Sequence, residues 1–399
     1  MHIAYITETY PPEINGVSLT TARTVQHLRQ AGHAVQLIRP RQPHEAALTF
    51  DDTEQPGDHT FDNGEWRTAG APIPMYPGLR FGWATVGALR ERWLQRPPQL
   101  VHAATPGPLA WAALRAARAL GIATTCDFRT NFHAYSRHYR LGWLQPAVLA
   151  YLRQLHAMAS RSFVPTRALA LELAARGFER LRVVGRGVDA GMFTPAQRDD
   201  GLRDAWGAGP GDTVLLHVGR LAAEKNVALA LDTFEHLRRS HARLHMVVAG
   251  DGPLRNKLAA AHPDVHFVGL QRAGALARCY ASADVFLFPS LTDTFGNVAL
   301  EALASGLVLV AFDSAGAGAL VHHDYNGFLA EPDDPAAFIA VAEQALAAAG
   351  RGSIVRQRAR ALALRSDWDT ALLAFEHQLA ELVDAATPRR EQVDDAALV

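Results

Sequence analysis

The chain has 399 residues, of which 49% are hydrophobic and 20% are charged, a composition typical of folded globular proteins. At roughly 100–200 residues per domain, this length predicts two domains. The 39 Lys and Arg residues nearly balance the 40 Asp and Glu residues, which gives a formal net charge of -1. This balance argues against a protein that binds nucleic acid through bulk positive charge.

The cysteines and the N-terminus indicate the cellular compartment. Cys126 and Cys279 are far apart and form no CxxC pair, so we expect two reduced thiols rather than a disulfide framework or a structural zinc site. The N-terminal residues lack the cationic start and apolar stretch of a signal peptide. No apolar run reaches the roughly 18 residues that span a bilayer. We therefore expect a cytoplasmic protein, and peripheral contact with the inner face of the plasma membrane stays open.

Short apolar runs bounded by Gly or Pro alternate with helix-like stretches along the chain, a pattern that predicts parallel sheets of βαβ units. Thr20–Ala31 has the character of a helix and ends at Gly32. The expected strands are His2–Ile6, Ala34–Ile38, Leu100–Ala103, Ile122–Cys126, Val183–Val184, Val214–Val218, Leu244–Ala249, Val285–Phe288 and Leu307–Ala311.

Composition also marks the domain boundaries. Val188–Gly211 contains Pro195, Pro210 and a charged run, so we interpret it as a linker that leads into a second domain. His44–Pro77 is polar and predicts a long surface excursion of the first domain. The predicted units are an N-terminal domain over 1–187, a second domain over 188–365, a helix over 366–386 that packs back toward the first domain, and a flexible tail over 387–399.

Strand-to-helix turns are where α/β sheets bind ligands, because helix N-termini there offer free N–H groups to phosphate. The first such turn is Thr7–Val17, where Gly16 would let the backbone approach a bound group. The second is Val218–Asn226, in which Arg220 and Lys225 suit a diphosphate. The alternative for each is an ordinary turn or a solvated pair of cations.

A third turn joins the strand that ends at Phe288 to an apolar helix. Asp293 lies in this turn and Glu301 eight residues later, inside the helix, where its carboxylate could accept hydrogen bonds from sugar or ribose hydroxyls. The alternative is a capped helix with one exposed acid. Gly250–Pro253 forms a fourth, tight turn after a strand.

Two other motifs are less convincing. Gly185–Ala190 fits GxGxxG/A, but Gly191 and Pro195 follow too soon for the helix of a Rossmann fingerprint, so a hinge loop is expected. Asp367–Asp369 resembles a metal-binding DxD, but it begins a late helix far from any Gly-rich turn. No metal and no resident cofactor are therefore expected.

Together the turns resemble the retaining glycosyltransferases of family four, and in particular their bacterial α-mannosyltransferase-like group. The resemblance extends from His2 to about Leu382. Phe288–Gly306 is similar to the E-x7-E signature of that family, Gly219–Lys225 to its diphosphate-binding Arg and Lys, and Asn15–Val17 to its first glycine loop. The resemblance implies the GT-B fold, an α/β architecture in which two Rossmann-like domains face each other across a cleft.

The resemblance also implies roles for individual residues. Arg220 and Lys225 would hold the pyrophosphate of a sugar-nucleotide donor, and Glu301 would bind its ribose. Asp293 would lie near the transferred sugar, and Gly16 would close on the donor from the first domain. Backbone N–H groups and apolar walls around the donor would come from Val268, Gly269, Phe295, Gly296, Asn297 and Val298.

Two positions depart from the family pattern. The leading Glu of E-x7-E is Asp293, which keeps the charge but is one methylene shorter. Where the family often has a sugar-facing histidine, this chain has Arg129, and His133 follows one helical turn later. The sequence leaves open which of the two faces the sugar.

The resemblance implies transfer of a hexose, with mannose from GDP-mannose as first choice, to an acceptor hydroxyl of a sugar or glycolipid. In GT-B enzymes retention is explained by front-face attack, and here Arg220 and Lys225 would stabilise the leaving diphosphate without a metal. The alternatives are a UDP-sugar donor, a non-catalytic nucleotide-sugar-binding subunit, and an NAD-dependent oxidoreductase, which the missing fingerprint helix disfavours.

Two stretches of the first domain combine aromatic and basic residues, Leu79–Arg96 and Arg137–Arg153. Such mixtures suit a bilayer interface, where rings lie at headgroup depth and cations meet anionic lipid. The hypothesis is a lipid-linked acceptor reached from an anionic membrane surface. The alternative is that the aromatic residues belong to the core and the arginines are merely solvated.

Overall fold

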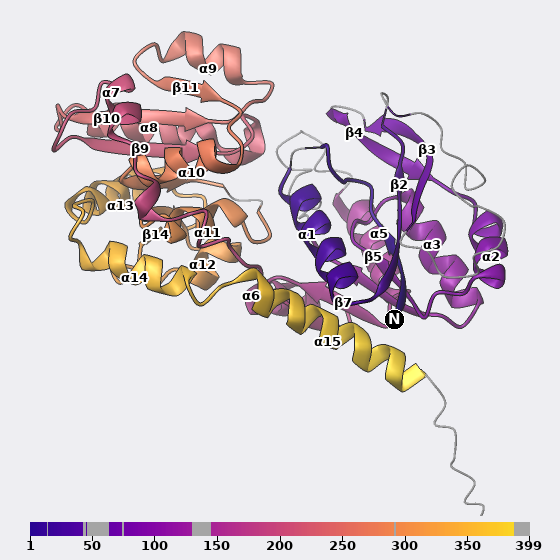
Figure 1. The fold of residues 1–399 in the computed structure, drawn as a ribbon. Helices are drawn as coiled ribbons and strands as arrows, with labels where there is room; N and C mark the ends of the chain where they lie inside the picture. Colours follow the sequence, from indigo (N-terminus) through magenta and orange to yellow (C-terminus); the bar gives the residue numbers. More distant parts are fainter. Residues whose placement is uncertain are drawn as a thin grey trace, which may run out of the picture.

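The computed structural model describes residues 1–13, 15–42, 45, 64–73, 76–129, 145–290 and 293–386. Two α/β lobes, each built on its own sheet, lie next to each other (Figure 1). The first sheet has eight strands in the order β4-β3-β2-β1-β5-β6-β7-β8, and the second has six in the order β11-β10-β9-β12-β13-β14. All neighbouring strands of the two sheets are parallel except β3 and β4, which confirms the predicted class of two α/β domains.

The N-terminal domain contains the first sheet and the helices on its faces. Its strands are β1 (His2–Ile6), β2 (Ala34–Pro40), β3 (Glu65–Ile73), β4 (Tyr76–Trp83), β5 (Leu100–Ala103), β6 (Ala123–Asp127), β7 (Arg161–Val164) and β8 (Leu181–Val183). Its helices are α1 (Gly16–Gln30), α2 (Val86–Gln95), α3 (Pro108–Ala119), α5 (Gln145–Ala157) and α6 (Arg167–Ala175).

The C-terminal domain contains the second sheet. Its strands are β9 (Thr213–Val218), β10 (Leu244–Ala249), β11 (His266–Gly269), β12 (Val285–Phe288), β13 (Val308–Phe312) and β14 (Phe328–Ala330). Its helices are α7 (Asp200–Ala205), α8 (Val227–Leu237), α9 (Arg255–Ala261), α10 (Ala273–Ser282), α11 (Asn297–Ala304), α12 (Ala315–Leu320), α13 (Pro335–Ala347) and α14 (Ile354–Ala363), with short 3-10 turns η3 (Pro195–Gln197) and η4 (Ala223–Lys225).

Most strand predictions are confirmed to within a residue or two, but the prediction that residues 44–77 form a polar surface excursion is wrong in part. Residues 65–73 and 76–83 of that region and its continuation form β3 and β4, the last two strands at one end of the first sheet, with β4 at its edge. Thr68 is the one buried residue of β3, so this end of the sheet is held together by backbone pairing and its sequence needs no apolar run. The first helix also begins four residues earlier than predicted, because the Asn15 side chain accepts from the Ser18 N–H and caps it.

The strand order brings the binding turns to the same place in each sheet. In the first sheet β1 lies between β2 and β5, and in the second β9 lies between β10 and β12. These are points where the strand order reverses, and helices diverge there from the carboxyl ends of the strands. The turns after β1, β9 and β12 therefore all begin at the ligand-binding edges of their sheets.

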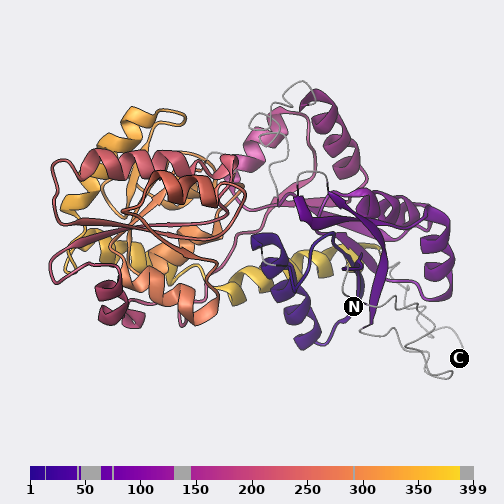
Figure 2. The same ribbon diagram turned by 90° about the horizontal axis from the view of Figure 1, so that it is seen from above.

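A last helix, α15 (Trp368–Ala386), leaves the C-terminal lobe and runs along the N-terminal one (Figures 1 and 2). Its Phe375, Leu379 and Val383 are buried in one cluster with Ile3 and Tyr5 of β1. The chain passes between the two domains twice, and the two connecting segments are hydrogen-bonded to each other, since the Val188 N–H donates to the Ser366 carbonyl at 2.8 Å. The C-terminal helix thus packs with the N-terminal domain, and the loop 185–188 forms the other crossing.

Two expectations about the whole chain can be compared with the described residues. Both cysteines are free, as predicted, and both are buried. Within the ranges that the structure describes, no helix is long and apolar enough to cross a membrane. The predicted tail over 387–399 lies outside the described residues.

Candidate active site

The predicted site residues come from turns at the facing edges of the two sheets, and contacts join three of these turns. Lys225 at the end of η4 reaches Asp293 in the turn after β12. At the other end of that turn, Asn297 Nδ2 donates to Thr20 Oγ1 of α1 at 3.3 Å and lies 3.8 Å from where a Cβ on Gly16 would be. Residues that sequence analysis took from three separate turns therefore form one constellation.

The Lys225–Asp293 pair is the centre of this constellation. Nζ of Lys225 contacts both carboxylate oxygens of Asp293, at 2.6 and 2.7 Å, and each side chain is less than a fifth exposed. Burial opposes ionisation of Asp293, but the ammonium outweighs it and holds the pKa of that carboxyl below its ordinary value. The Asp293 carboxylate is therefore ionised at neutral pH, and its charge is opposed by the Lys225 ammonium.

Arg220 has a more open position. Its side chain is 37% exposed, and it forms an ion pair with Glu224 at 3.9 Å. The fourth predicted turn braces the backbone here, because the Leu221 N–H donates to the Asp251 carbonyl at 2.9 Å. A Cβ on Gly250 would lie 1.9 Å from the Gly219 carbonyl oxygen, so only glycine permits this approach. The Gly250–Pro253 turn thus supports the Arg220 turn from behind.

Glu301 projects from α11 and is paired with an aromatic residue. The Tyr280 hydroxyl of α10 donates to Glu301 Oε2 at 3.0 Å. Burial raises the pKa of Glu301 to about 7, although the Tyr280 hydrogen bond and the charge of Arg23 both favour its ionised form. The carboxyl is therefore half-protonated near neutral pH and becomes a full acceptor only above that range.

The turn before α11 presents its backbone to the site. Gly296 precedes the helix with φ +77°, and no side chain caps the N–H groups that follow it. A Cβ on Gly296 would meet the Phe288 ring at 2.7 Å, so the turn needs glycine both for its dihedral angles and for space. The free N–H groups at the start of a helix are the ones that hold phosphate in nucleotide sites.

The apolar members of the predicted donor site lie on one core. Phe295 is buried in the larger hydrophobic cluster of the C-terminal domain, and Val268 and Val298 are partly buried against the same cluster. The two valines therefore keep some exposed surface that a ligand could contact.

The structure describes only one of the two candidates for the sugar-facing residue, Arg129, because His133 lies outside the described residues. Arg129 follows β6, and its side chain is 4% exposed. Its guanidinium donates to the Asp127 carboxylate, to Thr21 Oγ1 at 3.2 Å and to the Tyr5 hydroxyl at 3.1 Å. These three partners belong to the N-terminal domain, so the charge of Arg129 is directed into that domain.

Sequence analysis missed several side chains of the site. Tyr280 has the spacing of a core residue on α10, and Thr20 and Thr294 carry no motif of their own. His217 on β9 is 1% exposed, and its Nδ1 donates to the Leu287 carbonyl at 3.0 Å. Burial, aided by the Lys225 charge, lowers the pKa of His217 to about 4, so a neutral imidazole lies beneath the ion pair. No local pattern could have identified these residues, because each acquires its role from a partner far away in the chain.

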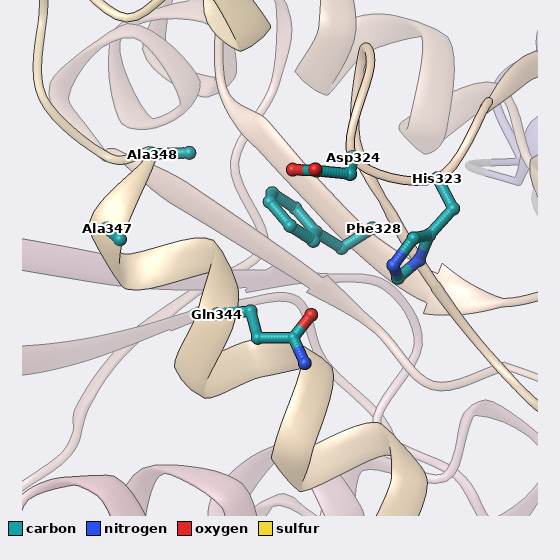
Figure 3. Close-up of a pocket in the computed structure, with 6 residues that line it drawn as sticks. All are labelled: His323, Asp324, Phe328, Gln344, Ala347 and Ala348. Atoms are coloured by element: carbon teal, nitrogen blue, oxygen red, sulfur yellow. The ribbon is translucent and has the colours of Figure 1, made fainter.

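A separate cavity of about 460 Å³ lies at the far side of the C-terminal domain, between β14 and α13 (Figure 3). It contains none of the predicted site residues. Its lining residues are His323, Asp324, Phe328, Gln344, Ala347 and Ala348. None of these lining residues is an Arg or a Lys that could meet a diphosphate, so this cavity is not the candidate site.

Comparisons with known proteins cover both domains. Residues 14–191 match the model of Glycosyltransferase Family 4, and residues 212–348 match Glycosyl transferases group 1. A GDP-mannose-dependent alpha-mannosyltransferase from Mycolicibacterium smegmatis is 34% identical over 84% of this chain and 85% of that protein. A sulfoquinovosyl transferase from Arabidopsis thaliana is 30% identical over 77% of this chain and 61% of that protein.

Solved structures share the fold. Anabaena HepE in complex with UDP aligns with a TM-score of 0.74 over 96% of this chain and 100% of that one, at 17% identity. At that identity the similarity concerns the GT-B fold alone. Taken with the sequence relatives and the matched family models, it leads to one conclusion: the chain belongs to glycosyltransferase family 4 and is a hexosyltransferase of the GT-B fold.

Proposed function

We propose that this enzyme transfers mannose from GDP-mannose to an acceptor hydroxyl with retention of the anomeric configuration. The donor is inferred from relatives that carry that activity in their names, at 30–34% identity over more than four-fifths of this chain. The observation that carries the site assignment is the Lys225–Asp293 contact, which joins the turn suited to a diphosphate to the turn suited to a sugar.

In the proposed reaction the bond from the anomeric carbon to the diphosphate oxygen breaks, and the acceptor oxygen bonds to that carbon on the same face. The acceptor proton passes to the departing diphosphate. Arg220 and Lys225 stabilise the negative charge as it develops on the leaving oxygens, which is the main catalytic contribution expected here. Lys225 must leave Asp293 to do so.

The other residues bind and orient. Glu301 accepts hydrogen bonds from the ribose hydroxyls, and Asp293, released by Lys225, accepts from hydroxyls of the mannose. The N–H groups of Phe295, Gly296 and Asn297 face the phosphate and the sugar. Val268 and Val298 line the base, and Gly16 approaches the donor from the other domain. His133 is the residue proposed to face the sugar, since the Arg129 guanidinium bonds to its own domain.

We propose no metal in this reaction. The two cations supply the charge that a divalent ion would otherwise provide to a leaving diphosphate. Asp367, the first carboxylate of the DxD-like segment, accepts from the Thr370 N–H at 2.6 Å and caps α15 instead.

We further propose a lipid-linked acceptor reached at the cytoplasmic membrane surface. On β4 and α2, Trp83 is 52% exposed and Leu94 is 67% exposed, and Arg90 between them is exposed too. Trp93 of the same stretch is buried in the core, so only part of the predicted aromatic set is available to a membrane. Residues 137–144 of the second stretch lie outside the described residues.

A panel of sugar nucleotides tests the donor. We expect GDP-mannose to raise the melting temperature more than UDP-glucose, UDP-galactose or GDP-glucose, and to be the donor whose labelled sugar reaches a lipid extract. A larger shift and faster transfer with a UDP-sugar would replace the donor assignment. Binding without transfer or hydrolysis for any donor would favour a non-catalytic nucleotide-sugar-binding subunit.

A further inference from the structure

The turn Asp293–Asn297 is hydrogen-bonded to the opposite domain at both ends. Thr294 Oγ1 donates to the backbone carbonyl of Arg129 at 2.8 Å, and Thr294 is 8% exposed. At the other end Asn297 Nδ2 donates to Thr20 Oγ1 at 3.3 Å. The donor-side turn therefore takes its position partly from the acceptor-side domain.

The acceptor of the Thr294 bond belongs to a residue that is anchored in the first domain. The Arg129 guanidinium is hydrogen-bonded to Asp127 on β6, Thr21 on α1 and Tyr5 on β1. These three elements belong to the core of the first domain, so Arg129 is tied to that domain by its side chain. A hydrogen bond from Thr294 to the Arg129 carbonyl therefore forms only when the N-terminal domain lies close to the turn.

Thr294 also directly follows Asp293, whose carboxylate accepts hydrogen bonds from Lys225 Nζ. Fixing the hydroxyl of Thr294 restricts the backbone that carries Asp293. When the domains separate, this bond and the Asn297 bond are lost together, while Lys225, Glu301 and Arg220 stay with the C-terminal domain.

We infer that Thr294 is a positioning residue that couples closure of the two domains to the placement of Asp293 against the transferred sugar, with Arg129 as the anchored partner. This inference rests on the proposed function of the same site. It gives Arg129 a role through its backbone rather than through contact with the sugar. Donor can then bind to an open enzyme, and transfer waits for closure.

The test uses Thr294→Val, which keeps the shape and removes the hydroxyl, with Thr294→Ser as the matched control that keeps it. We expect T294V to lower kcat about fivefold to tenfold, the effect of one buried hydrogen bond. The affinity for GDP, measured by calorimetry, stays within about twofold, because the diphosphate ligands lie in one domain. T294S restores kcat to within about twofold of the wild type.

A second readout is independent of catalysis. With GDP bound, small-angle X-ray scattering is expected to give a larger radius of gyration for T294V than for the wild type and T294S, because closure is weakened. An unchanged kcat, an equal loss in T294S, a parallel loss of GDP affinity or an unchanged radius of gyration would each overturn the inference. Failure of all donors to react would count against the proposed function, and the scattering comparison would still decide the role of Thr294 in closure.

Discussion

Lys225 and Asp293 lie 68 residues apart in the sequence, yet Nζ of the one contacts both carboxylate oxygens of the other at 2.6 and 2.7 Å. In the proposed function, the cation that meets the diphosphate is thus already paired with the acid that meets the sugar. We therefore expect this ion pair to compete with donor binding.

Asp293→Asn removes the competitor of the diphosphate. We expect D293N to bind GDP about fivefold more tightly than the wild type, the equivalent of ~1 kcal/mol for a partly exposed ion pair. Transfer of the sugar should nevertheless fall at least about tenfold, since the sugar loses a charged acceptor. Calorimetry with GDP and initial rates measure the two effects. Asp264→Asn, which breaks an exposed ion pair with Arg238, is the matched control. Weaker GDP binding in D293N would contradict the competition.

Lys225→Ala and Glu301→Ala should each raise the KM for the donor and lower kcat by at least about tenfold, because each removes a charged contact to the sugar nucleotide. Lys257→Ala and Glu343→Ala change exposed residues of the same types in the same domain and should leave both constants near the wild-type values. Lys225 and Lys257 are the only lysines of the chain, which makes this comparison a direct one. Near-wild-type kinetics for K225A and E301A would refute the assignment of the site.

The pKa of Glu301 near 7 predicts a pH dependence. Below that pH the carboxyl is protonated and is a poor acceptor of hydrogen bonds from the ribose hydroxyls. Above it the carboxylate accepts hydrogen bonds from both ribose hydroxyls. The kcat/KM for GDP-mannose should therefore rise up to about tenfold between pH 6 and pH 8, since this ratio reports the free enzyme. The profile should lose this rise in Glu301→Gln. Burial also raises the pKa of Glu8 in the N-terminal domain to about 7, so a rise that persists in E301Q would point to Glu8 instead.

Transfer should survive removal of divalent ions. We expect the rate in excess EDTA to stay within about twofold of the untreated rate, because Arg220 and Lys225 neutralise the leaving diphosphate. The assay is run on enzyme dialysed against the chelator, with and without added Mg²⁺ or Mn²⁺. Loss of activity that either ion restores would show that the cations of the chain do not suffice.

Co-sedimentation with liposomes tests the membrane surface. Binding to anionic vesicles should exceed binding to neutral ones and weaken with salt, since each basic residue near such a surface contributes about 1 kcal/mol. Trp83→Ala should reduce this binding, and Ile354→Ala, at an equally exposed position of the other domain, should not. If neither kind of vesicle binds the wild type, the acceptor is better sought among soluble sugars.

Local patterns in the sequence were enough to predict much of the fold. Runs such as Leu100–Ala103 and Val285–Phe288 predicted strands at those bounds, because a strand buried on both faces is mostly apolar. The peripheral strands β3 and β4 escaped detection, since backbone pairing at the end of a sheet needs no such run. Arg220, Lys225 and Asp293 stood out because they lie in strand-to-helix turns, and Glu301 because it lies in the helix that follows one of these turns.

Only the tertiary structure decided what these residues do to one another. Nothing near Lys225 in the sequence indicates Asp293, nothing near Glu301 indicates the Tyr280 hydroxyl, and nothing near Thr294 indicates the carbonyl of Arg129. Spacing along one element places side chains on a face, but contacts between elements depend on how sheets and domains pack. The sequence by itself determined which groups are present at the ends of the strands. The packing of elements within each domain decided which charges are paired and which pKa values shift. The packing of the two domains decided which turn is hydrogen-bonded to the opposite domain.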